Sequence, residues 1–189
     1  PARADDDSAR GEQSPKRDVP NYDGVGRPDA KPGNVGTWLA RILLSPLWFT
    51  TEYGMRVPAI VYRPDPKILQ WKGKLPGIVV VNGHGSDKFG WYAFYSGMLF
   101  ARAGAVVVTY DPLGEGERNS NRTSRQNPSP HDAVVDLPHW GQRLAGLMQT
   151  DLSQAVSYLA AHPDVDRARI GVVGYSMGAF ISGIAGALV

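Results

Sequence analysis

Three short hydrophobic runs without alternating polar positions mark the predicted strands: 78–81, 105–110 and 170–173. Continuous Val/Ile runs are typical of strands buried on both faces, as in parallel sheets covered by helices. Residues 91–103 and 141–161 between these runs carry apolar side chains at helical spacing. The order strand, helix, strand, long loop, helix, strand predicts a βαβ pattern with right-handed crossovers.

The chain before these strands divides into a polar tail and a hydrophobic segment. Residues 1–34 contain five prolines, four glycines and one aromatic residue. Such a segment buries too little apolar surface to offset its ordering entropy, so we expect a disordered or extended tail. From Trp38 to Leu43 apolar residues recur at helical spacing, and Pro46 ends the run. This pattern predicts a helix docked on the core.

A β-hairpin is predicted next. Residues 48–53 and 56–62 are rich in aromatic and β-branched side chains, and Gly54 lies between them. Pro58 lacks a backbone N–H, which places the second run at a sheet edge. The Pro- and Gly-containing residues 64–76 are expected to form a loop.

Composition narrows the class of protein. The 189 residues suit one ordinary domain, and 42% of them are hydrophobic. A formal net charge of +2 argues against binding nucleic acid through phosphate neutralisation. The absence of cysteine excludes disulfides, Cys-ligated metals and thiolate catalysis. A chain without cysteine is stable in either redox environment, so the cellular compartment is left open, with export slightly favoured over the cytoplasm. No apolar run reaches the roughly 18 residues of a transmembrane helix.

The strongest chemical signal is the sequence Gly174-Tyr175-Ser176-Met177-Gly178. It directly follows the 170–173 strand and opens an apolar helical stretch, which is the strand–turn–helix setting of a nucleophile elbow. In such a turn a strained backbone projects the serine hydroxyl from the sheet, and side chains two residues away on either side would clash. Ser176 is therefore the predicted nucleophile, supported by Gly174 and Gly178.

A second signal is Asn82-Gly83-His84-Gly85-Ser86, which directly follows the 78–81 strand. A serine nucleophile needs backbone N–H groups that bind the developing oxyanion. We expect one from Met177, after the serine, and one from Ser86, with Gly85 allowing the loop to bend. His84 is interpreted as a structural support of this loop rather than as the catalytic base.

Together these segments resemble the first half to two-thirds of an α/β-hydrolase. The resemblance covers about residues 48–189 and extends to two further motifs, 110–118 (YDPLGEGER) and 165–170 (VDRARI). Within that superfamily the chain is similar to acetyl xylan esterase-like and dienelactone hydrolase-like members. The resemblance implies a three-layer α/β sandwich, with a mainly parallel sheet, over residues 35–189. It also implies cleavage of small-molecule or carbohydrate esters through an acyl-serine intermediate, without a metal or another cofactor.

The acid and the histidine of a triad are missing after the serine. In α/β-hydrolases the order is Ser, then Asp or Glu, then His, but residues 177–189 contain no Asp, Glu or His. The histidines, at positions 84, 131, 139 and 162, all precede Ser176. We therefore expect the acid and base beyond Val189, and expect residues 1–189 alone to be inactive. A peptidase or thioesterase on the same fold, and a non-catalytic binding protein, remain alternatives; the oligomeric state is left open.

The acidic side chains of the 110–118 motif raise the question of a metal site. The spacing of Asp111, Glu115 and Glu117 matches no ligand pattern, and Arg118 offers a partner for the carboxylates. These residues are therefore interpreted as loop structure, with no metal and no cofactor expected.

Overall fold

The computed structural model describes residues 42–51, 54–67, 69–118 and 144–188. All of them belong to the second of two units into which the chain separates, Gly36–Val189. The predicted tail at 1–34 and the boundary that follows it lie outside the described residues. Within the described part, no helix is long and apolar enough to cross a membrane.

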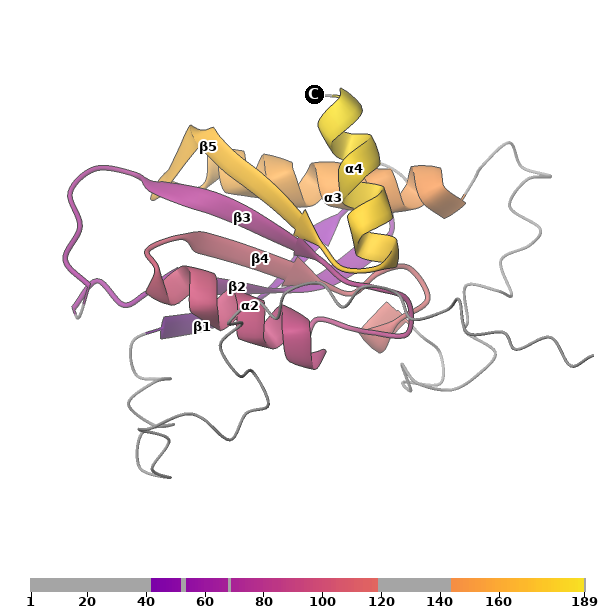
Figure 1. The fold of residues 1–189 in the computed structure, drawn as a ribbon, viewed down its shortest axis with the longest axis horizontal. Coiled ribbons are helices and arrows are strands. Elements are labelled where there is room, and N and C mark those ends of the chain that lie inside the picture. Colours follow the sequence, from indigo (N-terminus) through magenta and orange to yellow (C-terminus); the bar gives the residue numbers. More distant parts are fainter. Residues whose placement is uncertain (1–41, 52–53, 68, 119–143, 189) are drawn as a thin grey trace, which may run out of the picture. The chain divides into compact units, whose positions relative to one another are not determined.

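A five-stranded mixed sheet forms the centre of the fold (Figure 1). Its spatial order is β1-β2-β4-β3-β5. The β1–β2 and β2–β4 pairs are antiparallel, whereas β4–β3 and β3–β5 are parallel. The strands are β1 (Ile42–Thr50), β2 (Arg56–Pro64), β3 (Leu75–Val81), β4 (Val106–Tyr110) and β5 (Val165–Gly174). The predicted hairpin and the three predicted parallel strands are thus confirmed.

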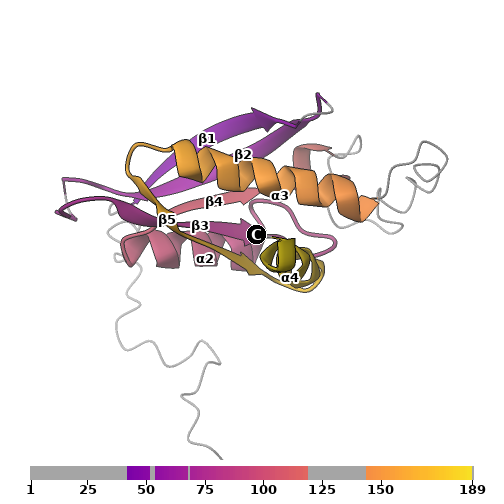
Figure 2. The same ribbon diagram turned by 90° about the horizontal axis from the view of Figure 1, so that it is seen from above.

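Helices cover both faces of this sheet. They are α2 (Trp91–Arg102), α3 (Leu144–Ala161) and α4 (Met177–Leu188), with a 3₁₀ turn, η1, at Gly116–Arg118. Figures 1 and 2 show α2 and α3 on opposite faces of the strands. Leu152 and Leu159 of α3 and Ile181 of α4 pack in one hydrophobic core, and Ala93 and Met98 of α2 pack in the other. This arrangement confirms the predicted three-layer α/β sandwich.

The predicted helix ending at Pro46 is wrong in its described part. Ile42 and Leu43 belong to β1, which pairs with β2 from Ile42↔Pro64 to Thr50↔Arg56. Leu47 and Phe49 pack on the core while Trp48 between them is exposed, so the segment has the two-residue period of a strand. Pairing with β2 makes this segment a strand, and the spacing of its apolar residues does not reveal that partner.

The sheet-edge position predicted from Pro58 is also wrong, because β2 lies between β1 and β4. The Pro58 carbonyl accepts the Asp111 N–H at 2.9 Å, but residue pairing with β4 begins only at Ala59↔Tyr110. Pro58, which has no N–H group to donate, therefore lies just beyond the last residue pair between β2 and β4. Its missing donor interrupts no hydrogen bond of that strand pair. The predicted 64–76 loop is shorter than expected, since Pro64 ends β2 and Leu75 begins β3.

Candidate functional site

The 174–178 turn joins β5 to α4 at the carboxyl end of the parallel strands (Figure 1). Ser176 has φ +53°, and it is the only non-glycine residue in the described part with positive φ. Such a backbone costs an ordinary side chain about 1–3 kcal/mol and is typical of functional turns. The Gly178 N–H donates to the Tyr175 carbonyl at 2.9 Å, and the Ala179 N–H donates to the Ser176 carbonyl at 2.9 Å. These bonds hold the turn against its strain.

Glycine is required on both sides of Ser176. A Cβ on Gly174 would overlap the Gly178 carbonyl, and a Cβ on Gly178 would overlap the Val81 carbonyl at the end of β3. The sequence-based expectation that side chains would clash across this turn therefore matches the packing. Glycine at position 178 therefore lets the start of α4 lie directly against the end of β3.

The 82–86 loop lies beside this turn, as the sequence predicts. The β3–β5 register pairs Val81 with Gly174, so both segments leave the sheet at the same end. The Tyr175 N–H donates to the Val81 carbonyl at 3.3 Å, and a Cβ on Gly83 would lie 3.0 Å from the Tyr175 carbonyl. The structure thus brings the backbone around Gly83 against the backbone beside Ser176.

Hydrogen bonds to three other segments hold the 82–86 loop, one from the loop's own Asn82 side chain and two to side chains outside the loop. Buried Asn82 donates from Nδ2 to the Tyr110 carbonyl at 2.7 Å. The Gly83 N–H donates to the Tyr92 hydroxyl, and the Gly85 N–H donates to Glu115 Oε1 at 2.9 Å. The sequence analysis did not predict that the Tyr92 hydroxyl and the Glu115 carboxylate accept hydrogen bonds from this loop. The available signal for Tyr92 was an aromatic hydroxyl in the first turn of the helix that follows the Gly-rich loop.

The acidic loop after β4 takes part in an ion-pair network whose centre, Lys88 and Asp111, is buried and whose Glu117 carboxylate is exposed. The carboxylate of Asp111 accepts Lys88 Nζ at 2.6 Å and also the backbone N–H groups of Lys88 and Glu117, each at 2.9 Å. Lys88 Nζ also donates to Glu117 Oε1 at 2.6 Å. Arg118, the partner expected from the sequence, instead pairs with the buried carboxylate of Asp151 on α3. Among the described residues, no group of His, Asp and Glu is placed to hold a metal ion.

Burial and charge oppose each other in this network. Burial raises the pKa of Asp111, although the hydrogen bonds and charge of Lys88 oppose the shift. Burial alone lowers the pKa of Lys88, but its hydrogen bonds and charge interactions with Asp111 and Glu117 outweigh this and raise the pKa overall. Lys88 is therefore charged at neutral pH, and it links the end of the 82–86 loop to the loop after β4.

Removing this cation is expected to destabilise the fold. Lys88→Met leaves Asp111 buried without its cation, which typically costs about 3–5 kcal/mol. Without Lys88 the folded-state pKa of Asp111 rises further above its unfolded value. A raised folded pKa favours folding at low pH, and that contribution is lost as the pH rises through the folded pKa. The stability deficit of the variant should therefore be larger at pH 7.5 than at pH 5.

Urea unfolding of the natural full-length protein at both pH values measures this deficit. The control is Arg169→Met, because the ion pair of Arg169 with Asp166 lies at the surface. That variant should leave the unfolding midpoint nearly unchanged. Equal midpoints for Lys88→Met and the wild-type protein would contradict a structural role for the network.

The described histidines differ in their distance from Ser176. His84 lies in the 82–86 loop and is exposed. His162 precedes β5, whereas Ser176 follows it. β5 pairs along β3 from Leu75 to Val81, so the length of the strand separates the two residues by about 20 Å. His162 therefore cannot act on the Ser176 hydroxyl. Positions 131 and 139 lie outside the described residues.

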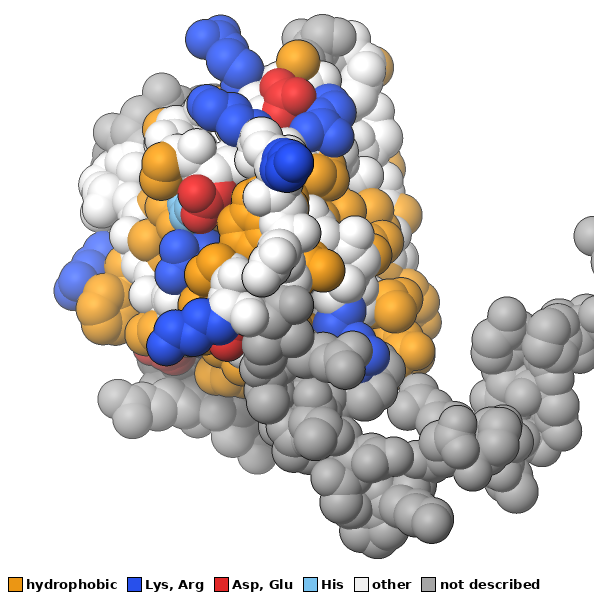
Figure 3. Space-filling model, turned by 90° about the vertical axis from the view of Figure 1, so that its left-hand side faces the viewer, with side chains coloured by type: hydrophobic (Ala, Val, Ile, Leu, Met, Phe, Trp, Pro, Cys, Tyr) orange, Lys and Arg blue, Asp and Glu red, His pale blue; other side chains and the backbone are white. Residues whose placement is uncertain are grey.

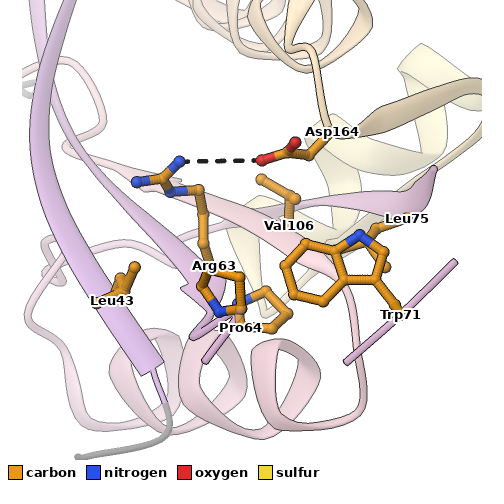
Figure 4. A pocket seen from close by; sticks show the side chains of 8 residues that line it. Leu43, Arg63, Pro64, Trp71, Leu75, Val106 and Asp164 are labelled. Carbon is orange, nitrogen blue, oxygen red and sulfur yellow. Dashed lines mark ion pairs between the residues drawn. The ribbon is translucent and has the colours of Figure 1, made fainter. Parts of the chain in front are cut away.

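Two hollows lie away from the 174–178 turn. One, of about 190 Å³, is at the amino end of the parallel strands, where Trp71, Leu75 and Val106 lie beneath an Arg63–Asp164 pair at 3.9 Å (Figure 4). Figure 3 shows apolar side chains at this end of the molecule, interspersed with Lys, Arg and acidic side chains. The other hollow, of about 460 Å³, lies between the hairpin and the loop after β4. Neither is lined by the 174–178 turn or the 82–86 loop.

Comparison with known proteins identifies the family. The sequence pattern of the alpha/beta hydrolase family matches residues 78–189, so the chain belongs to that family. Among curated protein sequences, none matches this chain.

Solved structures share the fold at low sequence identity. An acetyl xylan esterase from Paenibacillus sp. R4 has a TM-score of 0.62 at 18% identity, covering 80% of this chain and 46% of its own. Acetyl xylan esterase 1 from Thermoanaerobacterium sp. has a TM-score of 0.60 at 22% identity, covering 83% and 54%. A dienelactone hydrolase-like promiscuous phosphotriesterase from metagenomic libraries has a TM-score of 0.57 at 15% identity, covering 77% and 54%. The chain thus spans about half the length of these structures.

Proposed function

We propose that this chain carries the nucleophile of a serine hydrolase that cleaves carboxylic esters through an acyl-serine intermediate. The observation that carries the proposal is the backbone of Ser176, a strained non-glycine residue at a strand-to-helix turn. The 82–86 loop beside that turn provides N–H groups of the kind that stabilise an oxyanion. Membership of the alpha/beta hydrolase family and the acetyl xylan esterase neighbours support the ester-hydrolase class.

In the proposed mechanism a histidine base removes the Ser176 proton as Oγ attacks the ester carbonyl carbon. The negative charge that develops on the carbonyl oxygen is stabilised by the backbone N–H groups of Met177 and Ser86. Met177 is the first residue of α4, so its N–H has no acceptor within the helix. Expulsion of the alcohol gives the acyl-serine, and water then releases the acid. We expect the base and its carboxylate partner to lie downstream, since the solved relatives are about twice as long.

The experiment that tests the proposal is phosphonylation of the natural full-length protein by a fluorophosphonate probe. Mass spectrometry should locate the adduct on Ser176, and a crystal structure of the adduct should show which donors bind the phosphonyl oxygen. The proposed donors require that oxygen to lie about 2.7–3.1 Å from the nitrogens of Met177 and Ser86. An adduct on another residue would overturn the assignment of the nucleophile. Contact of that oxygen with the backbone nitrogen of His84 instead of that of Ser86 would correct only the identity of the second donor.

Residues 1–189 expressed alone should hydrolyse esters far more slowly than the full-length protein, because an unactivated serine is a weak nucleophile. They should also associate in solution. β5 is the last strand in the sheet order, and Val173, Tyr175 and Phe180 near it are exposed. Light scattering and p-nitrophenyl acetate turnover, compared between the two proteins, measure both effects. A monodisperse 189-residue protein that matches the longer one in turnover would require the base to lie within these residues.

A further inference from the structure

The Tyr92 side chain connects three parts of the candidate site. Its hydroxyl accepts the Gly83 N–H and also shares a hydrogen bond with the Ser86 side chain. Its ring packs against the ring of Tyr175, with the centroids 4.4 Å apart. One side chain from the first turn of α2 therefore touches both ends of the segment 83–86 and the residue that precedes Ser176.

Glu115 holds the same segment at its middle. Its carboxylate is almost completely buried, at 1% residue exposure, and Oε1 accepts the Gly85 N–H at 2.9 Å. The Glu115 backbone is fixed by bonds to Pro112, from its own N–H at 3.0 Å, and to Arg118, through its carbonyl at 2.9 Å. Glu115 therefore presents its acceptor from a loop that is itself constrained.

A loop of this composition needs such constraints. Gly83 and Gly85 lack the side chains that restrict backbone rotation, and Gly85 has φ +72°. Fixing one residue costs about 1–2 kcal/mol of backbone entropy, so a Gly-rich loop is not rigid by itself. Oxyanion stabilisation is effective only when the donors are already oriented before the reaction.

We propose that Tyr92 and Glu115 are positioning residues. They fix the 82–86 loop so that the backbone N–H of Ser86 stays directed at the reacting carbonyl oxygen. Neither side chain reacts; each acts through a glycine N–H of the loop. The inference rests on the proposed function, since it assigns the loop to the same oxyanion site. Burial raises the pKa of Tyr92, although hydrogen bonds from Gly83 and Ser86 oppose this, so the phenol is protonated at neutral pH.

Paired variants of the full-length protein test this role. Tyr92→Phe retains the ring beside Tyr175 but removes the acceptor for Gly83. Glu115→Met removes the acceptor for Gly85, whereas Glu115→Gln retains an amide oxygen that accepts the same N–H. The matched control is Tyr95→Phe, which removes the hydroxyl of an exposed tyrosine on the same helix.

Tyr92→Phe and Glu115→Met should each lower kcat for a p-nitrophenyl ester about 10- to 100-fold, because small displacements of catalytic groups have effects of this size. KM should stay within about 3-fold, since the oxyanion contact strengthens in the transition state. Glu115→Gln should recover most of the lost rate, and Tyr95→Phe should match the wild-type protein. A smaller folded fraction would also lower the apparent kcat without changing KM, so kcat is referred to the concentration of active sites titrated with the fluorophosphonate probe. A role confined to folding would leave the kcat per titrated site at the wild-type value.

Values of kcat within 2-fold of wild type for both Tyr92→Phe and Glu115→Met would overturn the inference. Should Tyr92→Phe fail to fold, the Glu115 pair decides alone, and equal kcat for the methionine and glutamine variants counts against the role. Phosphonylation of Ser176 in the wild-type protein separates the two proposals. Without labelling the proposed function fails, whereas labelling with unchanged variant rates means that only the positioning role fails.

Discussion

Ser176→Ala in the natural full-length protein should abolish fluorophosphonate labelling and lower ester turnover by about four to six orders of magnitude. Loss of the hydroxyl removes the acyl-serine route, which leaves only the residual acceleration from binding and oxyanion stabilisation. Because Ser176 lies exposed at the turn, the substitution should leave the fold intact. Gel fluorescence of the labelled protein and turnover of a short-chain aryl ester measure the two effects.

Ser182→Ala is the matched control for this experiment. Ser182 lies on α4, and its hydroxyl donates to the Gly178 carbonyl at 2.7 Å, a local helix bond with no part in the proposed chemistry. Labelling and turnover should remain close to wild type. Turnover that persists in Ser176→Ala would instead favour a binding protein with a contaminating esterase, or a different nucleophile.

Gly178→Ala is expected to have the largest effect on stability. The new Cβ would overlap the Val81 carbonyl and lie 2.7 Å from the Asn82 carbonyl, and both atoms belong to the backbone. Backbone at the end of a central strand cannot move aside as a side chain can, so we expect a loss of about 3 kcal/mol or more. The same displacement would separate the start of α4 from β3. Urea or thermal unfolding measures the loss.

Gly183→Ala provides the opposite expectation on the same helix. A Cβ at Gly183 would meet no atom within 4 Å, and alanine is favoured over glycine in a helix interior by about 1 kcal/mol. This variant should be as stable as the wild-type protein or slightly more stable. A folded Gly178→Ala protein that unfolds at the wild-type midpoint would show that the turn tolerates a wider separation from β3.

Sequence patterns were sufficient where local chemistry dominates. Ile78 to Val81 and Val106 to Tyr110 have uninterrupted apolar side chains apart from Thr109, a pattern typical of strands covered on both faces. They failed for β1, where Leu47 and Phe49 pack inward only because β2 pairs with the segment. They also misplaced Pro58, since a single sequence does not show which side of the strand lacks a donor.

The sequence by itself determined the α/β class, the strand–turn–helix position of Ser176 and the requirement for glycine at Gly174 and Gly178. These features depend on short-range sterics and on the period of apolar residues, which neighbouring residues encode. Only the tertiary structure decided that Lys88 pairs with Asp111, and that Tyr92 and Glu115 hold the 82–86 loop. The contacts of Lys88 with Asp111 and of Gly85 with Glu115 join loops that meet because β3 and β4 end at the same end of the sheet, whereas Tyr92 reaches Gly83 through the turn into α2. Pairing of this kind depends on register and side-chain direction across the fold, which no local pattern specifies.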